Sequence, residues 1–351
     1  MEDINIKKIN STILITLTRE KVLNALNLNM VREIFKNIGV WDKDNDISGI
    51  IIQGAGEKSF CAGGDIVSVY HSKNELNSSL SNDFFREEYI LNLSIANFSK
   101  PWISLLNGIA MGGGLGLSVH GKYRIVNNKT VTAMPETAIG LFPDVGGGYF
   151  LSRMGNLGAY LALTGRVMNG FDSIYAGIGT HFIENENIEL IIKKIIDTNN
   201  YNNEFVDNIL NENAQVLKSN VSSLSKEVDS IAKHFSKDTL SEIFESLEKD
   251  NSEWANNTLE VLSKKSPTSM GVALKQLSLA KNLSLKECLI MEFRICQAMM
   301  AKNDFYEGVR ANLVDKDRNP KWDPESINGV TEKIVNEHFQ SLGERELFDN
   351  E

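Results

Sequence analysis

The sequence predicts an α/β protein of stacked strand–strand–helix units with a helical region appended at its C-terminal end. Short apolar runs that fit strands alternate with helix-like segments in the first half, whereas strand signals are nearly absent beyond about residue 203. The chain has 351 residues, more than a usual single domain, and 42% of them are hydrophobic, enough for a sizeable core. We therefore expect two parts, a core of residues 1–186 that carries the active site and a helical region of residues 187–351 that covers it.

The elements of the first part follow from periodicity and from breakers. Residues 13–18 predict a strand, and residues 27–39 predict a helix because their apolar side chains recur at helical spacing. A strand at 47–53 ends at the glycines of 54–56, and a helix at 83–98 ends before Pro101. Further short strands are expected at 102–109, 122–126 and 131–134.

Helix signals dominate the second part. Residues 188–196 have a helical pattern, and the Asn-rich stretch 199–203 predicts a loop. Two capping boxes, Thr239 with Glu242 and Ser284 with Glu287, predict helix starts. Another start is expected at Ser266-Pro267, which places proline at the first helical position.

Composition excludes several classes of function. The formal net charge of −10 argues against non-specific nucleic-acid binding, which needs a basic surface. No run of eighteen apolar residues is present, so no membrane-spanning helix is expected. Three cysteines are too few and too scattered for a disulfide framework or a CxxC metal site, and no metal centre is expected. The first twelve residues resemble neither a secretory signal nor a transit peptide. We expect a cytoplasmic protein in a bacterium, or a mitochondrial matrix protein with its leader removed in a eukaryote.

The most informative stretch is residues 107–153. It holds two glycine clusters, at 112–114 and 146–148, and between them Glu136 and Asp144 lie eight residues apart. Clustered glycines let backbone N–H groups approach a ligand closely. A strand-like run precedes the first cluster and a helix-like run, 115–120, follows it, which places its amides at a helix N-terminus. Such an amide can stabilise an oxyanion that develops in a transition state.

A second amide donor is expected in the segment Ser59–Ile66, which also follows a strand-like run. Together these segments resemble the crotonase superfamily, strongly over residues 10–185. The resemblance implies a spiral of strand–strand–helix turns, in which the backbone N–H groups of Gly64 and Gly113 polarise the thioester carbonyl of an acyl-CoA. It also implies that the loop holding Ala62, Gly63, Asp65 and Ile66 lines the substrate, that coenzyme A enters as part of the substrate and not as a cofactor, and that a homo-oligomer is possible.

The carboxylates indicate the branch of the superfamily. Hydratases of the superfamily carry a glutamate just after the first glycine cluster, where this chain has Gly116. They carry a small residue where this chain has Asp144, in Phe-Pro-Asp-Val-Gly-Gly-Gly. That segment, the run 84–89 and the segment 304–322 resemble the branch that hydrolyses 3-hydroxyisobutyryl-CoA in valine breakdown.

The resemblance implies a role for each of three carboxylates. Glu136 serves the hydrolytic step, as the base for a water molecule or as a nucleophile through a transient anhydride. Asp144 holds the 3-hydroxyl group of the substrate and influences the protonation of Glu136. Glu88 contacts the same hydroxyl or supports the site. The sequence alone leaves open which of the three carboxylates has which role. It also leaves open the choice between 3-hydroxyisobutyryl-CoA and 3-hydroxypropionyl-CoA as the substrate.

Each of these residues also has a structural interpretation. Asp144 precedes a helix-like run and fits its N-cap. Glu88, in an Arg-Glu-Glu run, fits a solvated helix face or an ion pair. Cys61 fits a small buried apolar residue better than a nucleophile.

Two rival functions follow from these alternatives. An acyl-CoA hydratase or isomerase is disfavoured by Gly116 and Asp144. A non-catalytic structural paralogue within a larger assembly is disfavoured because the five expected site residues are intact: Gly64, Glu88, Gly113, Glu136 and Asp144.

Overall fold

The computed structural model describes residues 3–75, 78–218 and 221–348. Its internal contacts divide the chain into two compact units, each assembled from three separate segments. Unit 1 consists of Met1–Gly64, Ile90–Thr132 and Val167–Lys226. Unit 2 consists of Asp65–Tyr89, Ala133–Arg166 and Glu227–Glu351. Residues 133–166, which include Glu136 and Asp144, thus group with the C-terminal helices, and the predicted boundary near residue 186 stays a prediction.

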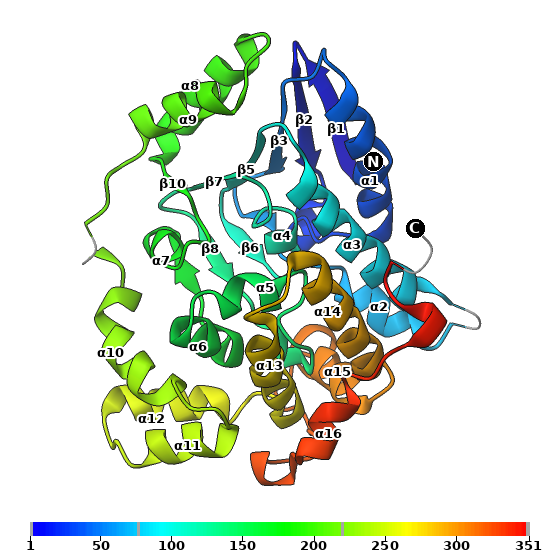
Figure 1. Cartoon of the computed structure of the whole chain (residues 1–351), viewed down its shortest axis with the longest axis vertical. Helices are drawn as coiled ribbons and strands as arrows, with labels where there is room; N and C mark the ends of the chain where they lie inside the picture. Colours follow the sequence, from blue (N-terminus) through cyan, green and yellow to red (C-terminus); the bar gives the residue numbers. More distant parts are fainter. Residues whose placement is uncertain (1–2, 76–77, 219–220, 349–351) are drawn as a thin grey trace. The chain divides into compact units, whose positions relative to one another are not determined.

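Unit 1 holds two sheets. Of their residues only Ala133, the last residue of β8 (Val131–Ala133), falls in unit 2. The larger sheet has the order β1-β2-β3-β5-β7-β10 (Figure 1). The smaller sheet has the order β4-β6-β8-β9. In the larger sheet β1 pairs antiparallel with β2, and the remaining pairs are parallel. The strands are β1 (Ile4–Ile9), β2 (Thr12–Leu17), β3 (Gly49–Gly54), β4 (Ser59–Cys61), β5 (Trp102–Leu106), β6 (Ile109–Met111), β7 (Tyr123–Val126), β8 (Val131–Ala133), β9 (Met168–Asn169) and β10 (His181–Phe182).

Helices pack on the larger sheet because its central strands, β3 and β5, are mostly apolar and buried. All five residues of β5 are buried, as expected for a parallel strand between two layers. Apolar side chains of β3, β5 and β7 form one core cluster with those of α8 (Asn185–Asp197) and α9 (Asn203–Asn213). The other helices of unit 1 are α1 (Leu28–Lys43), α4 (Gly113–Gly116) and α7 (Gly170–Tyr175), with a 3-10 turn, η1 (Glu20–Val22).

Unit 2 is helical where the structure describes it. Within it, α13 packs against α5, α6, α14 and α16, and α15 packs against the turn η2. Its helices are α2 (Ile66–Ser72), α5 (Gly147–Ser152), α6 (Asn156–Thr164), α11 (Leu240–Glu248), α12 (Glu253–Leu262), α13 (Pro267–Ala280), α14 (Leu285–Met300), α15 (Asn303–Val309) and α16 (Glu332–Glu337). Its short turns are η2 (Glu136–Ile139), the π-helical η4 (Arg310–Val314), η5 (Ile327–Gly329) and η6 (Gly343–Arg345). Two helices continue from one unit into the other, α3 (Leu80–Asn97) and α10 (Leu224–Phe235).

Most predicted elements are confirmed, with shifted ends. The helix predicted at 27–39 is α1, which continues to Lys43 and is N-capped by Asn27. Both predicted capping boxes are present, at α11 and α14, and Pro267 is the first residue of α13. Beyond Phe182, every regular element among the described residues is a helix or helical turn. Each described helix is too short or too polar to span a bilayer.

Two predictions were wrong in detail. The strand predicted at 102–109 is two strands, β5 and β6, in different sheets, because Gly108 turns the chain with a φ of 76°. The helix predicted at 115–120 is α4, which spans only Gly113–Gly116. Its three glycines favour a helix weakly, and β7 begins a few residues later.

Candidate active site

Two backbone amides of unit 1 lie at the ends of neighbouring strands. β4 pairs in parallel with β6, so the loops that leave their carboxyl ends, through Gly64 and through Gly113, share one edge of the smaller sheet. A Cβ added to Gly63 would lie 3.3 Å from the Met111 carbonyl oxygen and 3.9 Å from the Gly113 nitrogen. The structure therefore brings the two predicted amide-bearing loops together.

Both amides keep their hydrogen-bonding capacity. Gly113 is the first residue of α4, so its N–H has no acceptor within the helix. The Gly63 carbonyl accepts a hydrogen bond from Leu26 N–H at 2.8 Å, and Ala62 N–H donates to Leu23 at 3.0 Å. Among the turn and loop hydrogen bonds between described residues, none is donated by Gly64 or Gly113. Each is available to an oxygen atom of a ligand.

The other predicted residues of the first loop have structural partners. Asp65 N-caps α2, because its Oδ1 accepts a hydrogen bond from Ser68 N–H at 3.1 Å, and Ile66 is the first residue of that helix. Cys61 is fully buried, and its thiol donates to the Gly63 carbonyl at 3.6 Å. This thiol is a packing and loop-fixing group, in agreement with the apolar interpretation.

Three carboxylates gather in unit 2, and all are buried. Glu88 lies on α3, Glu136 opens the turn η2, and Asp144 lies in the loop before α5. Tyr89, the residue after Glu88, donates its hydroxyl to Oδ2 of Asp144 at 2.8 Å. One oxygen of Glu88 and one of Glu136 are buried without a hydrogen-bond partner among the described residues. Burying an oxygen atom without a hydrogen-bond partner costs free energy. A polar group of a bound substrate would supply the missing partner.

Burial and mutual repulsion set the acidity of this cluster. Burial raises the pKa of Glu88 well above its usual range, and the charge of Asp144 raises it further. Burial and the charge of Asp144 likewise raise the pKa of Glu136, while Lys265 opposes them. Burial raises the pKa of Asp144 to about 7, against the hydrogen bond from Tyr89. Groups that titrate above their usual range can exchange protons near neutral pH, as acid–base catalysis requires.

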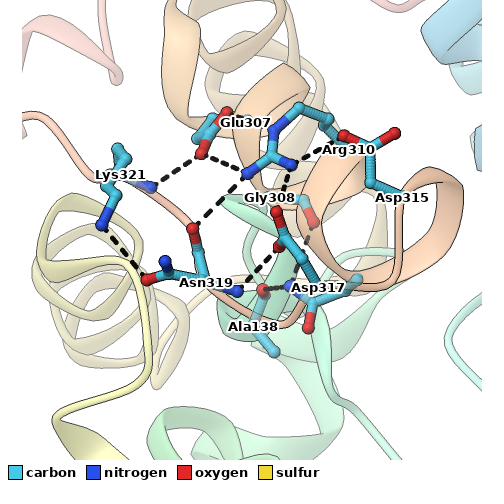
Figure 2. A network of polar contacts seen from close by, with 9 residues as sticks. Ala138, Glu307, Gly308, Arg310, Asp315, Asp317, Asn319 and Lys321 are labelled. Atoms are coloured by element: carbon cyan, nitrogen blue, oxygen red, sulfur yellow. Dashed lines mark hydrogen bonds and ion pairs between the residues drawn. The ribbon is translucent and has the colours of Figure 1, made fainter.

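Figure 2 shows the contacts around η4, which packs against the turn of Glu136. Arg310 pairs with Glu307 at 2.9 Å, Asp315 at 2.7 Å and Asp317 at 2.6 Å, which fixes the start of η4 (Figure 2). From the same turn, the Asn312 amide donates to the Ala138 carbonyl of η2 at 2.8 Å. The C-terminal segment therefore helps to hold the turn that carries Glu136.

Two structural interpretations of the carboxylates are wrong. Asp144 is not the N-cap of α5: that position is Gly146, and the Asp144 side chain is hydrogen-bonded to Tyr89 instead. Glu88 does not lie on a solvated face, since its exposed fraction is 1%.

Four residues that surround the carboxylates were not predicted as functional from the sequence: Tyr89, Lys265, Gln276 and Glu292. Tyr89 lies at the end of the run 84–89, and Lys265 directly precedes the predicted helix start Ser266-Pro267. Glu292 had a usable signal, because it falls on the apolar stripe of α14 between Cys288 and Cys296, where a solvated acid is not expected. Gln276 is likewise buried on α13.

The comparisons with known proteins identify the family of the chain. A family model described as enoyl-CoA hydratase/isomerase matches residues 12–339. The chain is 46% identical to a mitochondrial 3-hydroxyisobutyryl-CoA hydrolase of Danio rerio, covering 97% of this chain and 90% of that protein. It is 44% identical to the protein of that name in Homo sapiens, covering 99% of this chain and 90% of that protein.

Solved structures show the same fold. A carnitinyl-CoA dehydratase from Mycobacterium thermoresistibile superimposes with a TM-score of 0.92 at 33% identity, covering 100% of this chain and 99% of that one. An enoyl-CoA hydratase from Rhodobacter sphaeroides superimposes with a TM-score of 0.88 at 33% identity, covering 99% of each chain. The chain has the crotonase-type α/β fold with a helical C-terminal region, and it belongs to the enoyl-CoA hydratase/isomerase family.

Proposed function

We propose that this protein hydrolyses the thioester of 3-hydroxyisobutyryl-CoA to the free hydroxy acid and coenzyme A. The observation that carries the proposal is the buried cluster of Glu88, Glu136 and Asp144, together with Gly116 at the position where hydratases carry a glutamate. The similarity to hydrolases of that name over nearly the whole chain supports the same substrate. By the same similarity we propose the mitochondrial matrix as its compartment in a eukaryote, and the cytoplasm in a bacterium.

In the proposed reaction the N–H groups of Gly64 and Gly113 donate to the thioester carbonyl oxygen. They stabilise the negative charge that develops there when the carbonyl carbon is attacked, and one such donor is typically worth about 3–4 kcal/mol. Because the donors are main-chain groups, the sequence controls them only through the geometry of the two loops. The proposal requires both amides and the carboxylates to act on one thioester.

Glu136 performs the hydrolytic step in one of two ways. As a base, it takes a proton from water while the oxygen of that water bonds to the carbonyl carbon, and it returns the proton to the thiolate as the C–S bond breaks. As a nucleophile, its oxygen displaces the thiolate to form an anhydride, which water then cleaves. Its buried oxygen, which has no partner among the described residues, suits either role.

Asp144 and Glu88 bind the 3-hydroxyl group in this proposal. Tyr89 donates to one oxygen of Asp144, and the proposal places the substrate hydroxyl at the other. 3-Hydroxypropionyl-CoA lacks one methyl group, a difference worth only about 1–3 kcal/mol in an apolar pocket. We therefore expect it to be a slower second substrate.

A second candidate function is hydration or dehydration of an acyl-CoA. The two structural relatives, a dehydratase and a hydratase at 33% identity, favour it. Gly116 argues against it because a glycine supplies no second acid–base group.

The test measures thiol release from 3-hydroxyisobutyryl-CoA and hydration of crotonyl-CoA, for the wild type, Glu136→Gln and Asp144→Asn. We expect wild-type CoA release, suppressed at least about 100-fold by Glu136→Gln because the amide can neither accept the proton nor attack. Asp172→Asn, a buried aspartate of unit 1 outside the cluster, is the matched control and should keep kcat.

Two other outcomes reject the proposal. Hydration without CoA release would support the hydratase. Folded protein that neither releases CoA nor hydrates crotonyl-CoA would support a non-catalytic paralogue. Acyl transfer to the Glu136 peptide, trapped by rapid quench and detected by mass spectrometry, would identify the nucleophilic route.

A further inference from the structure

The loop that carries Asp144 has a strained backbone. Val145, directly after Asp144, has a φ of 51°, and Gly146 follows with a φ of 83°. A β-branched residue in the left-handed region is an outlier with a strained backbone. The conformation therefore persists only because other contacts impose it.

A buried acid from a distant helix supplies two of these contacts. Glu292 of α14 is fully buried, and its Oε2 accepts a hydrogen bond from Gly146 N–H at 2.7 Å. Its Oε1 accepts from Gly148 N–H at 2.9 Å. These amides belong to the first turn of α5, whose N-cap Gly146 has no side chain to satisfy them. Glu292 thus performs from α14 the capping that a local side chain usually performs.

Gln276 of α13 holds Pro143, the residue before Asp144, by a hydrogen bond. Its amide nitrogen donates to the Pro143 carbonyl at 2.9 Å and to Oε1 of Glu292 at 3.1 Å. A Cβ added to Gly148 would lie 2.9 Å from that nitrogen and 3.0 Å from Oε1 of Glu292, so a side chain there would displace one of these two groups. Asp144 is therefore flanked by two held peptide segments, while Tyr89 fixes its carboxylate.

We propose that Glu292, with Gln276, is a positioning residue that holds the strained Val145–Gly146 backbone and so directs the Asp144 carboxylate toward the substrate. The proposal deepens the proposed function and rests on it, since positioning matters through the role of Asp144. Burial raises the pKa of Glu292 to about 8, whereas its three hydrogen-bond partners among the described residues are all N–H donors and favour the ionised carboxylate. Replacement by glutamine turns one acceptor into a donor that faces another donor.

The experiment compares Glu292→Gln with Ile295→Val, a mild change of a fully buried apolar residue on the same helix. We expect Glu292→Gln to lower kcat on 3-hydroxyisobutyryl-CoA by about 10- to 100-fold with KM within about threefold, because small misplacements of a reacting group have effects of that size. Amide hydrogen exchange in a peptide covering residues 143–150 should accelerate in the same variant. Ile295→Val should change neither quantity.

Gln276→Met is the second variant, in case Glu292→Gln does not fold. It frees the Pro143 carbonyl but leaves both bonds from the glycine amides to Glu292, so we expect a smaller loss of kcat and local acceleration of exchange. Unchanged kcat in folded Glu292→Gln would overturn the proposal. So would an equal loss of kcat in Ile295→Val, which would reveal only a general effect of destabilisation.

The exchange measurement separates this proposal from the proposed function. If the wild type releases no CoA but hydrates crotonyl-CoA, the hydrolase is rejected, and kcat for hydration is compared in the same variants. Faster exchange together with slower hydration would then keep the positioning role. Exchange equal to that of the wild type would refute it.

Discussion

The turn that carries Glu136 and the loop that carries Asp144 are held by different kinds of contact, although eight residues separate the two carboxylates. Neutral groups and close backbone packing hold the Glu136 turn: Asn312 donates to Ala138, and Ser266 N–H donates to Thr137 at 3.0 Å. A buried acid holds the Asp144 loop, through Glu292. The first arrangement uses neutral hydrogen bonds and packing, whereas the second combines a strained backbone with a buried acid, which we propose directs the Asp144 side chain.

The largest expected effect concerns the stability cost of the Asp144 carboxylate. Burial raises its pKa to about 7, above the ordinary 3.8, so the folded state binds this proton more tightly than the unfolded state. Protonation of Asp144 therefore stabilises the folded state most below about pH 4, and this stabilisation is lost as the pH rises through about 7. Asp144→Asn should abolish this loss and raise the free energy of unfolding at pH 8, by at most about 4 kcal/mol, while reducing activity. Urea unfolding of both proteins at pH 4 and pH 8 measures this change in the free energy of unfolding.

Asp172 of unit 1 is the matched control with the opposite sign. Burial tends to raise the pKa of Asp172, but hydrogen bonds from Ser222, Ser223 and Leu224 lower it below its usual value. Asp172→Asn should therefore destabilise the protein at pH 8. Equal behaviour of the two variants would contradict the view that Asp144 lies in a costly environment.

The second prediction concerns Gly308, where an added side chain should overpack and displace the Glu136 turn. A Cβ added to Gly308 of α15 would overlap the Ile139 backbone of η2, which cannot yield easily. We expect Gly308→Ala to destabilise the protein by about 1–3 kcal/mol and to lower kcat, since the turn shifts with Glu136 on it. Gly39→Ala is the control: its Cβ would meet nothing within 4 Å, and it should be neutral or stabilising. Thermal unfolding and thiol release measure both effects.

Gly308→Ala also sharpens the comparison with Glu292→Gln. Damage to a turn held by packing should reduce stability and activity together. Damage to the loop held by Glu292 should reduce activity more than stability. A Gly308→Ala variant of wild-type stability that had nevertheless lost activity would show that the two regions do not differ in this way.

The sequence predicted what is locally encoded. Pro135-Glu136, the two glycine clusters and the capping boxes each lie within a few residues of the structure they specify, and their helices and turns are present. The spiral of strand–strand–helix turns came from the family resemblance, because periodicity alone does not distinguish one α/β arrangement from another.

What could not be predicted is non-local. Glu292 reaches Gly146 across 146 positions of sequence, and no short motif records such a contact. The division of α3 between two units is equally invisible to periodicity, since the helix itself is continuous. A buried acid on an apolar helix stripe is the signal that would have identified Glu292.

The smallest expected effect concerns Lys265, which distinguishes the surroundings of Glu136 from those of Asp144. The charge of Lys265 lowers the pKa of Glu136, and burial lowers the pKa of Lys265 itself to about 8. Lys265→Met should therefore raise the pKa of Glu136 and move the acidic limb of the kcat/KM profile to higher pH, because Glu136 must be ionised to react. The neighbouring Lys264 pairs with Glu260 on the surface, so Lys264→Met should leave that limb in place. An acidic limb at the same pH in Lys265→Met would mean that the ionisation controlling the rate belongs to another carboxylate, and Asp144 would then replace Glu136 as the group that must lose its proton.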